Sequence, residues 1–327
     1  MRRRALVVLA LALPSACAGL DGLTGGGKND PPTDGGSTPN DSGIALDGGG
    51  SSSSGALDGG VTDSGPPTCD RSGPFTSITP VSGLPVGAAE VVLTADELEI
   101  FFTMPFGDAG QRDVKRATRG SPTGGFGAAS DPLAIHLGDE QPYVVVSGGL
   151  TLVGALGGDP GFITRPATSQ PFGSVQRLDV QKLGGFGTEL VFVWMNDAQT
   201  AAYGVERGFL DSRVVRYLAA PGNLTLPVDL GLSSAGAQDA AVVLTEDELQ
   251  MFVTSKRTGS AARDVYVTSR ADKGAAWGPL TLVSELNTSG DDSMTSLSRD
   301  GCVAYGVRSN SGGGGGALVY RAEKPKK

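Results

Sequence analysis

The sequence predicts an all-β fold in which one structural unit is repeated along the chain. From Cys69 onward, valine, leucine, phenylalanine and tyrosine occur in short runs separated by glycine, proline, aspartate and threonine, and no long stretch has the period of a helix. One run, Val91–Phe101, returns 151 residues later as Val242–Phe252, and both copies contain Leu-Thr-x-Asp-Glu-Leu. Self-similarity of this kind is typical of a repeat architecture.

The match between the two copies continues without a gap, because Arg112-Asp113-Val114 aligns with Arg263-Asp264-Val265. A third copy, Leu297–Cys302, follows the second by 53 residues. Since 151 is close to three times 50, two degenerate units are expected between the first two copies. Residues 143–172 and 190–230 each contain three short apolar runs and the start of a fourth. Every unit is therefore predicted to hold an inner strand, a tight turn, two further strands and an outer strand.

Four short antiparallel strands in every ~50 residues predict the blades of a single β-propeller. The last unit ends after three strands, whereas Phe75–Leu84 forms an outer strand with no blade before it. We therefore expect the N-terminal strand to complete the last blade and close the ring. The predicted outer strands begin at Phe75, Phe126, Phe172, Leu224 and Trp277. This count gives about five blades over residues 69–327, and the choice between five and six stays open here.

The N-terminus has the order of an export signal. Arg2–Arg4 precede an apolar run, Ala5–Leu13, that is too short to span a bilayer, and small residues follow it. Residues 1–16 are therefore predicted to be a signal peptide. The segment Pro14–Cys17 resembles the lipobox of bacterial lipoproteins, which implies acylation of Cys17, although its proline stands where that family prefers leucine. Ordinary cleavage beside Ala16 or Ala18 is the alternative.

Residues 17–68 consist almost entirely of glycine, serine, aspartate, threonine and proline, without an aromatic residue. Such a segment buries too little apolar surface to offset its chain entropy, so a disordered linker is predicted. The chain is thus expected to be a monomer that is exported and held in the cell envelope, at the outer membrane or the periplasmic face, through a lipid on Cys17. Export to an oxidising compartment and the expected ring closure together predict a disulfide between Cys69 and Cys302.

The turn of the repeat contains an aspartate in each clear copy: Asp96, Asp247 and Asp300. Each stands at the first position of a tight turn, where its side-chain oxygen can accept hydrogen bonds from backbone N–H groups. A structural role is therefore expected for all three.

The pattern Leu-Thr-x-Asp-Glu-x-x-x-Phe, followed by Arg-Asp-Val and then by an aromatic residue and glycine, resembles the WD40-like PD40 repeats of TolB-type periplasmic propellers. The resemblance covers residues 75–322 and is specific in the first, fourth and fifth units. Glu97 and Glu248 replace the glycine that usually follows the turn aspartate. TolB-type proteins have six blades and an additional N-terminal domain, so the resemblance implies the propeller fold and not their partners.

The composition excludes several classes of function. The formal net charge is −9, and −12 without the three arginines of the predicted signal, so nucleic acid is not expected as a partner. His136 is the only histidine, and no Cys/His cluster has the spacing of metal ligands. We therefore expect no metal, no cofactor and no Ser-His-Asp chemistry, and a structural role for His136.

These features are compatible with two functions. The main prediction is a non-catalytic binding or scaffold module that displays the propeller to an unidentified protein or glycan. The alternative is a five-bladed propeller glycoside hydrolase or lyase that acts on envelope or extracellular polysaccharide, which needs carboxylates that converge on the ring axis. The candidates stand at the starts of the inner strands, where solvated loop residues are the simpler interpretation: Glu90, Asp139, Glu140, Glu189 and Asp239. Trp194 and Trp277 are assigned to the core.

Overall fold

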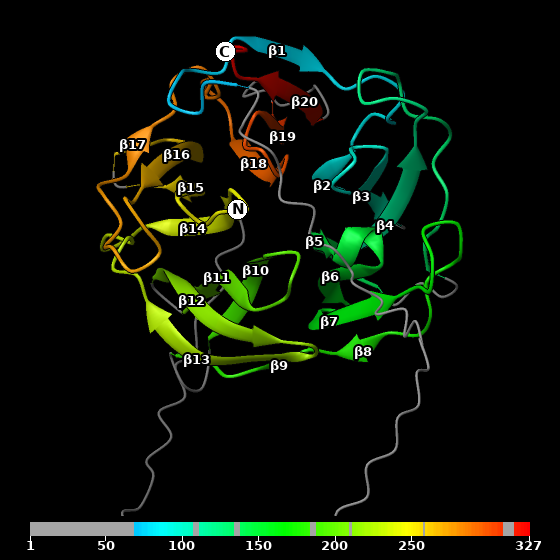
Figure 1. Ribbon diagram of the computed structural model, residues 1–327, viewed down its shortest axis with the longest axis horizontal. Coiled ribbons are helices and arrows are strands. Elements are labelled where there is room, and N and C mark those ends of the chain that lie inside the picture. The colour runs from blue at the N-terminus through cyan, green and yellow to red at the C-terminus, as the bar shows by residue number, and fades with distance from the viewer. Residues whose placement is uncertain are drawn as a thin grey trace, which may run out of the picture. The chain divides into compact units, whose positions relative to one another are not determined.

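The computed structural model describes residues 69–106, 111–133, 138–183, 188–208, 211–257, 259–309 and 317–327. This part of the chain forms a five-bladed β-propeller, which confirms the predicted fold and settles the blade count (Figure 1). The predicted signal peptide and linker, with Cys17, and His136 lie outside the described residues. Within those ranges, no helix has the length and apolar character needed to cross a membrane.

The blades follow one another around the ring in chain order (Figure 1). Blade 1 contains β2 (Ala89–Leu93), β3 (Glu99–Phe106) and β4 (Gln111–Thr118). Blade 2 contains β5 (Gln141–Val146), the short 3₁₀ turn η1 (Ser147–Gly149), β6 (Thr151–Leu156), β7 (Asp159–Thr164) and β8 (Gln176–Arg177). Blade 3 contains β10 (Glu189–Met195), β11 (Ala201–Arg207), β12 (Ser212–Ala220) and β13 (Asn223–Asp229), and β9 (Asp179–Val180) pairs with β13 in parallel.

Blade 4 contains β14 (Gln238–Leu244), β15 (Gln250–Lys256), β16 (Asp264–Ser269) and β17 (Thr281–Leu282). Blade 5 contains β18 (Asp292–Leu297), β19 (Val303–Arg308), β20 (Leu318–Glu323) and, as its outermost strand, β1 (Ser77–Pro80).

The inner strands β2, β5, β10, β14 and β18 surround the ring axis (Figure 1). Their apolar residues are buried on both faces because each blade packs against two neighbours, and this explains the continuous apolar runs in the sequence. The pairing of every inner strand with its second strand contains a register shift. Such bulges increase local twist and bend the strand, which suits strands that curve around a common axis.

The outer strand of blade 3, β13, has the predicted length, whereas the outer strands of the other blades are shorter than the sequence predicts. β8 and β17 have two residues each, and in blade 1 only an isolated bridge from Arg116 to Ser130 takes the place of the outer strand. Glycine and proline are frequent in these segments, and proline lacks the N–H that a ladder requires. Strands were predicted to begin at Phe126, Phe172 and Trp277. These aromatic side chains instead lie before the short outer strands and pack against the hydrophobic core.

The N-terminal strand closes the ring as predicted. β1 pairs antiparallel with β20, from Ser77 opposite Glu323 to Pro80 opposite Tyr320. Cys69 and Cys302 form the expected disulfide, with Cα atoms 5.7 Å apart. The ring of Phe75 lies 6.0 Å from that of Phe252 in blade 4, and Asp70 N donates to the carbonyl of Pro325. Residues from both ends of the propeller therefore build one joint, which we call the seam.

We predict that the double variant Cys69→Ser/Cys302→Ser folds but is less stable by about 2–5 kcal/mol, because the disulfide closes a very long loop in the unfolded chain. Denaturant unfolding followed by circular dichroism measures the difference. In strong reductant, the wild-type protein should unfold at the same denaturant concentration as the double variant. Free thiols at both positions in non-reducing peptide maps would contradict the seam as described.

Candidate active site

The turn that ends each inner strand has the same polar frame in three blades. In blade 1 the hydroxyl of Thr94 donates to Asp96 Oδ1, which also accepts from the backbone N of Leu98 at 3.0 Å. Thr245 and Asp247 make the same contacts in blade 4, and Ser298 and Asp300 make them in blade 5. The side chains on either side of the intervening residue are therefore held by the turn, whereas the intervening residue has no part in this frame.

That intervening position varies from blade to blade. In ring order it is occupied by Ala95, Ser147, Asp197, Glu246 and Arg299. Two adjacent blades thus present small residues, and the other three present two acids and a base. A position without a structural task that carries three charged side chains is a candidate for function.

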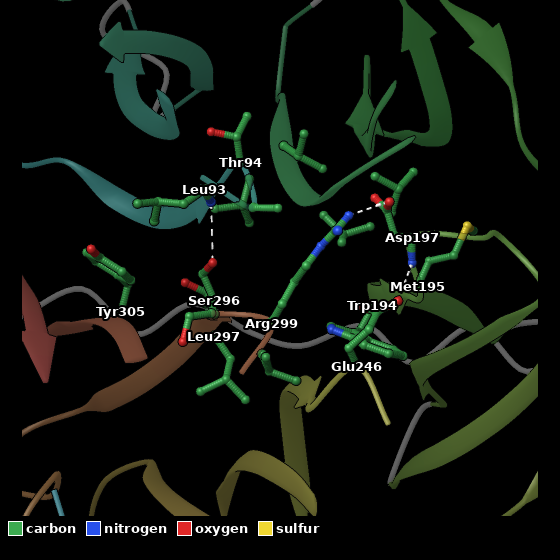
Figure 2. Close-up of a pocket in the computed structure, with 18 of the residues that line it drawn as sticks. Leu93, Thr94, Trp194, Met195, Asp197, Glu246, Ser296, Leu297, Arg299 and Tyr305 are labelled. Atoms are coloured by element: carbon green, nitrogen blue, oxygen red, sulfur yellow. Dashed lines mark hydrogen bonds and ion pairs between the residues drawn. The ribbon is translucent and has the colours of Figure 1, made fainter. Parts of the chain in front are cut away.

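The three charged residues contact one another although they come from three blades. Arg299 of blade 5 reaches across to form an ion pair with Asp197 of blade 3 (Figure 2). Between those blades, Glu246 accepts a hydrogen bond at its Oε1 from the backbone N of Asp197, 3.1 Å away. The other carboxylate oxygen of Asp197, Oδ1, accepts from Gly148 N at 3.1 Å. We call Asp197, Glu246 and Arg299 the charged triad.

The two acids of the triad have different surroundings. Burial raises the pKa of the Glu246 carboxyl above its ordinary value, against the smaller lowering effects of the Asp197 backbone N–H and the Arg299 charge. Asp197 forms an ion pair with the guanidinium group of Arg299. A buried carboxyl with a raised pKa beside a carboxylate that is paired with arginine is an arrangement that acid–base catalysis can use.

The charged triad borders a central cavity lined by the second halves of all five inner strands. Its volume is about 60 Å³, so it holds a few water molecules and no sugar ring. Trp194 and Tyr305 also line it, and Figure 2 shows Trp194 beside the triad and Tyr305 on the other side of Ser296. Trp194 is buried as predicted, with its ring 6.0 Å from that of Tyr203, so it serves packing and cavity lining together.

Glu97 is a third acid on the cavity wall, but its contacts are those of a clamp between blades. It accepts hydrogen bonds from the Tyr305 hydroxyl of blade 5 and from Arg119. Burial, followed by the charge of Glu97, raises the pKa of Tyr305 to about 12, so this hydroxyl stays a donor. Glu248 makes the equivalent contacts in blade 4, to the Tyr203 hydroxyl at 2.8 Å and to Arg270 at 3.6 Å.

This clamp explains the missing glycines of the repeat. Glu97 and Glu248 have φ of 59° and 57°, a left-handed conformation that costs roughly 1–2 kcal/mol in a residue other than glycine. Hydrogen bonds to a buried charged group contribute about 1.5–3 kcal/mol each and outweigh that cost. Blade 5 keeps Gly301 at this position, where a Cβ would lie 2.8 Å from Thr245 Cγ2 and 3.2 Å from the Nε of Arg71, a seam residue.

The acids singled out from the sequence lie at the other ends of the inner strands and do not form one site. Glu140 and Asp239 are buried: Glu140 accepts from Val114 N at 3.2 Å, and Asp239 accepts from Ser212 and Arg257. They link neighbouring blades and are not solvated loop residues.

Only two of the other sequence candidates are brought together by the structure. Arg112 joins Glu90, at 2.7 Å, to Asp139, at 3.0 Å, and burial raises the pKa of Glu90. Glu189 is exposed. In the ranges that the structure describes, no group of three metal-ligating side chains is present.

No family model matches the chain, and no curated protein is similar to it in sequence. Solved structures with a similar fold include a thermostable family-43 glycoside hydrolase, with 13% identity over 77% of this chain and 97% of that chain and a TM-score of 0.51. A GH62 hydrolase in complex with xylotriose has 10% identity over 74% and 95%, with a TM-score of 0.47. TolB from Acinetobacter baumannii has 12% identity over 74% and 55%, with a TM-score of 0.42.

The comparison with the family-43 glycoside hydrolase contradicts the prediction of a non-catalytic binding or scaffold module and favours the alternative. The family-43 hydrolase shares the propeller along almost its whole chain, so this fold does not argue against catalysis. Scarcity of histidine was also a poor reason to exclude an enzyme, because glycoside hydrolysis requires only carboxyl groups. The catalytic acids considered from the sequence lie at the starts of the inner strands, whereas the charged triad lies just beyond the ends of these strands.

We predict that Tyr203→Phe lowers the free energy of unfolding by about 1–3 kcal/mol, because it leaves buried Glu248 and Arg270 without a shared partner. Tyr266→Phe is the matched control, since this half-buried hydroxyl makes no hydrogen bond within the described residues. Urea unfolding of both variants measures the effect. Equal stability of the two variants would contradict the clamp.

Proposed function

We propose that this protein is a glycoside hydrolase whose acid and base are Glu246 and Asp197. The observation that carries the proposal is the charged triad at the central cavity, in which a carboxyl with a raised pKa lies beside a carboxylate paired with arginine. Hydrolysis of a glycosidic bond uses two carboxyl groups, one that donates a proton and one that accepts a proton. The propeller shared with a family-43 glycoside hydrolase agrees with this assignment.

In the proposed reaction Glu246 donates its proton to the glycosidic oxygen as the bond to the sugar breaks. Asp197 accepts a proton from a water molecule as the water oxygen bonds to the anomeric carbon. Arg299 positions Asp197 through the ion pair, and Gly148 N donates to the second carboxylate oxygen. Both protons are thereby accounted for, one leaving Glu246 and one reaching Asp197.

The size of the central cavity suggests how the substrate approaches. A volume of about 60 Å³ admits water and excludes a sugar ring, so the sugar lies across the mouth and water reaches it from the cavity. The small side chains of Ala95 and Ser147 leave the mouth more open on the blade 1 and blade 2 side. Attack by water activated at Asp197 inverts the anomeric configuration, which NMR of the first product formed can test.

We also propose the setting in which the enzyme works. The order of arginines, apolar run and Cys17 favours export and a lipid anchor in the cell envelope, with residues 18–68 as the tether. The blades are proposed to be PD40-type repeats. The exported protein is proposed to be a monomer. An extracellular or envelope polysaccharide is the substrate that suits this location.

We predict that Glu246→Gln and Asp197→Asn each lower kcat/KM on a natural polysaccharide by about 10²–10⁴-fold. Glu246→Gln should recover much of its rate on an aryl glycoside with an acidic leaving group, which needs no proton, whereas Asp197→Asn should not. Reducing-sugar assays on a panel including xylan and arabinan, with aryl glycosides alongside, measure both effects.

Glu189→Gln and Asp139→Asn are the matched controls, because they remove acids at the opposite ends of the inner strands. They should stay within about twofold of wild type, in the range of ordinary surface substitutions. If the controls lost activity and the triad variants did not, the reaction would take place at the starting ends of the inner strands, and the assignment of Glu246 and Asp197 would be wrong. Absence of hydrolysis across the whole panel would reject the proposed function.

We predict that Glu246→Gln becomes more stable relative to wild type as pH rises from 4 to 8. Because the pKa of Glu246 is raised in the folded protein, the stability this carboxyl contributes at low pH is lost as it ionises. Glutamine has no charge to bury and shows no such loss. Melting temperatures at both pH values measure the trend, and a Glu246→Gln curve parallel to that of Glu189→Gln would contradict it.

A further inference from the structure

A second cavity lies between blades 3 and 4, at the starting ends of their inner strands. Its volume is about 270 Å³, several times that of the central cavity. The end of β11 and the residues that precede β12, β14 and β16 contribute to its wall. The lining residues, which we call the arginine pocket, are Arg207, Gly208, Asp211, Ser212, Ala237, Gln238 and Arg263.

Two arginines, Arg207 and Arg263, line this pocket. Within the part of the chain that the structure describes, neither guanidinium group has a carboxylate within 4.0 Å or donates a hydrogen bond. Both side chains are exposed. In a protein with a net charge of −9, two unneutralised arginines on one cavity are contrary to the average charge.

The acids near the pocket are engaged elsewhere. Asp211, on the wall itself, pairs with Arg213 at 3.7 Å, and Asp239, next to Gln238, pairs with Arg257 at 3.3 Å. Asp291 accepts from the backbone N of Arg263 at 2.8 Å and not from its side chain. Among the described residues, these three acids therefore do not neutralise the guanidinium groups of Arg207 and Arg263.

The repeat provides an internal comparison for Arg263. Its counterpart in blade 1, Arg112, is neutralised by Glu90 and Asp139. In blade 4 the sequence has Ala241 where Glu90 aligns, so the guanidinium group has lost its main partner. An arginine that is structural in one blade has thus become available in another, beside a cavity and a second arginine.

We propose that the arginine pocket binds an oxyanion, such as the carboxylate of one acidic sugar residue or inorganic sulfate. Guanidinium groups match the two oxygens of such groups with paired N–H donors, which a lysine cannot do. The Gln238 amide adds a neutral donor on the same wall. A cavity of about 270 Å³ is near the lower end of ligand sites and suits a single monosaccharide or a small anion.

The proposal is tested on the full mature chain by calorimetric titration and by the ligand-dependent rise in melting temperature. The probes are sodium sulfate, glucuronate and galacturonate, with glucose as the neutral comparison. Arg207→Ala and Arg263→Ala should each weaken anion binding about tenfold or more. Arg177→Ala, at an arginine of β8 whose side chain is 84% exposed, should bind as wild type does.

Tighter binding of the uronates than of sulfate identifies an acidic sugar as the ligand, and the reverse identifies a free anion; both support the site. Binding should weaken in high salt, because the guanidinium groups are exposed. Equal binding of glucose and glucuronate, unchanged affinity in both arginine variants, or no binding at millimolar concentration would overturn the proposal. Neither arginine touches the central cavity, so hydrolysis of a neutral polysaccharide should persist in both variants and keeps this test separate from the proposed function.

Discussion

A blade of this propeller is apolar on both faces, so it is stable only between two neighbours. The inner strands show the constraint directly: Val91, Val242 and Val193 are fully buried, each in a different blade. An open row of blades would expose one such face at each end, and closure of the ring removes both. The pairing of β1 with β20 is therefore the contact on which burial in every other blade depends, and the disulfide, Phe75 and Arg71 all reinforce it.

The turn at the end of each inner strand divides structural and functional work between adjacent residues. In blade 4, Thr245 and Asp247 hold the turn, Glu248 clamps the neighbouring blade through Tyr203, and Glu246 alone is free to face the cavity. Two glutamates separated by one residue thus have different environments and different roles. The same separation in blade 1 places Ala95 at the intervening position and Glu97 in the clamp, so only blades 3, 4 and 5 carry charge at the intervening position.

The sequence was sufficient to predict the blades, their number within one and the seam, because these follow from apolar runs, turn residues and the unmatched strands at the two ends. It was a poor guide to the site. The repeat was recognised from its identical residues, whereas Asp197, Glu246 and Arg299 occupy the position where the copies differ. Their contact also depends on ring curvature, which brings blades 3 and 5 across the cavity. Glu140 and Asp239 were interpreted from the sequence as solvated loop residues, but both are buried and link neighbouring blades. The sequence does not distinguish these two environments for a polar residue at the start of a strand.

The position of the disulfide has a mechanical consequence. Cys69 precedes β1 in the chain, and its partner Cys302 lies immediately before β19, beside the turn that follows β18. A force applied to the chain ahead of Cys69 passes through the covalent bond into blade 5 before it reaches the hydrogen bonds of β1. The closing strand is thus protected from being peeled off the ring edge, the direction in which a β-strand resists least. A propeller pulled from its N-terminal side would keep its ring intact under loads that would unzip the same ring with its cysteines reduced.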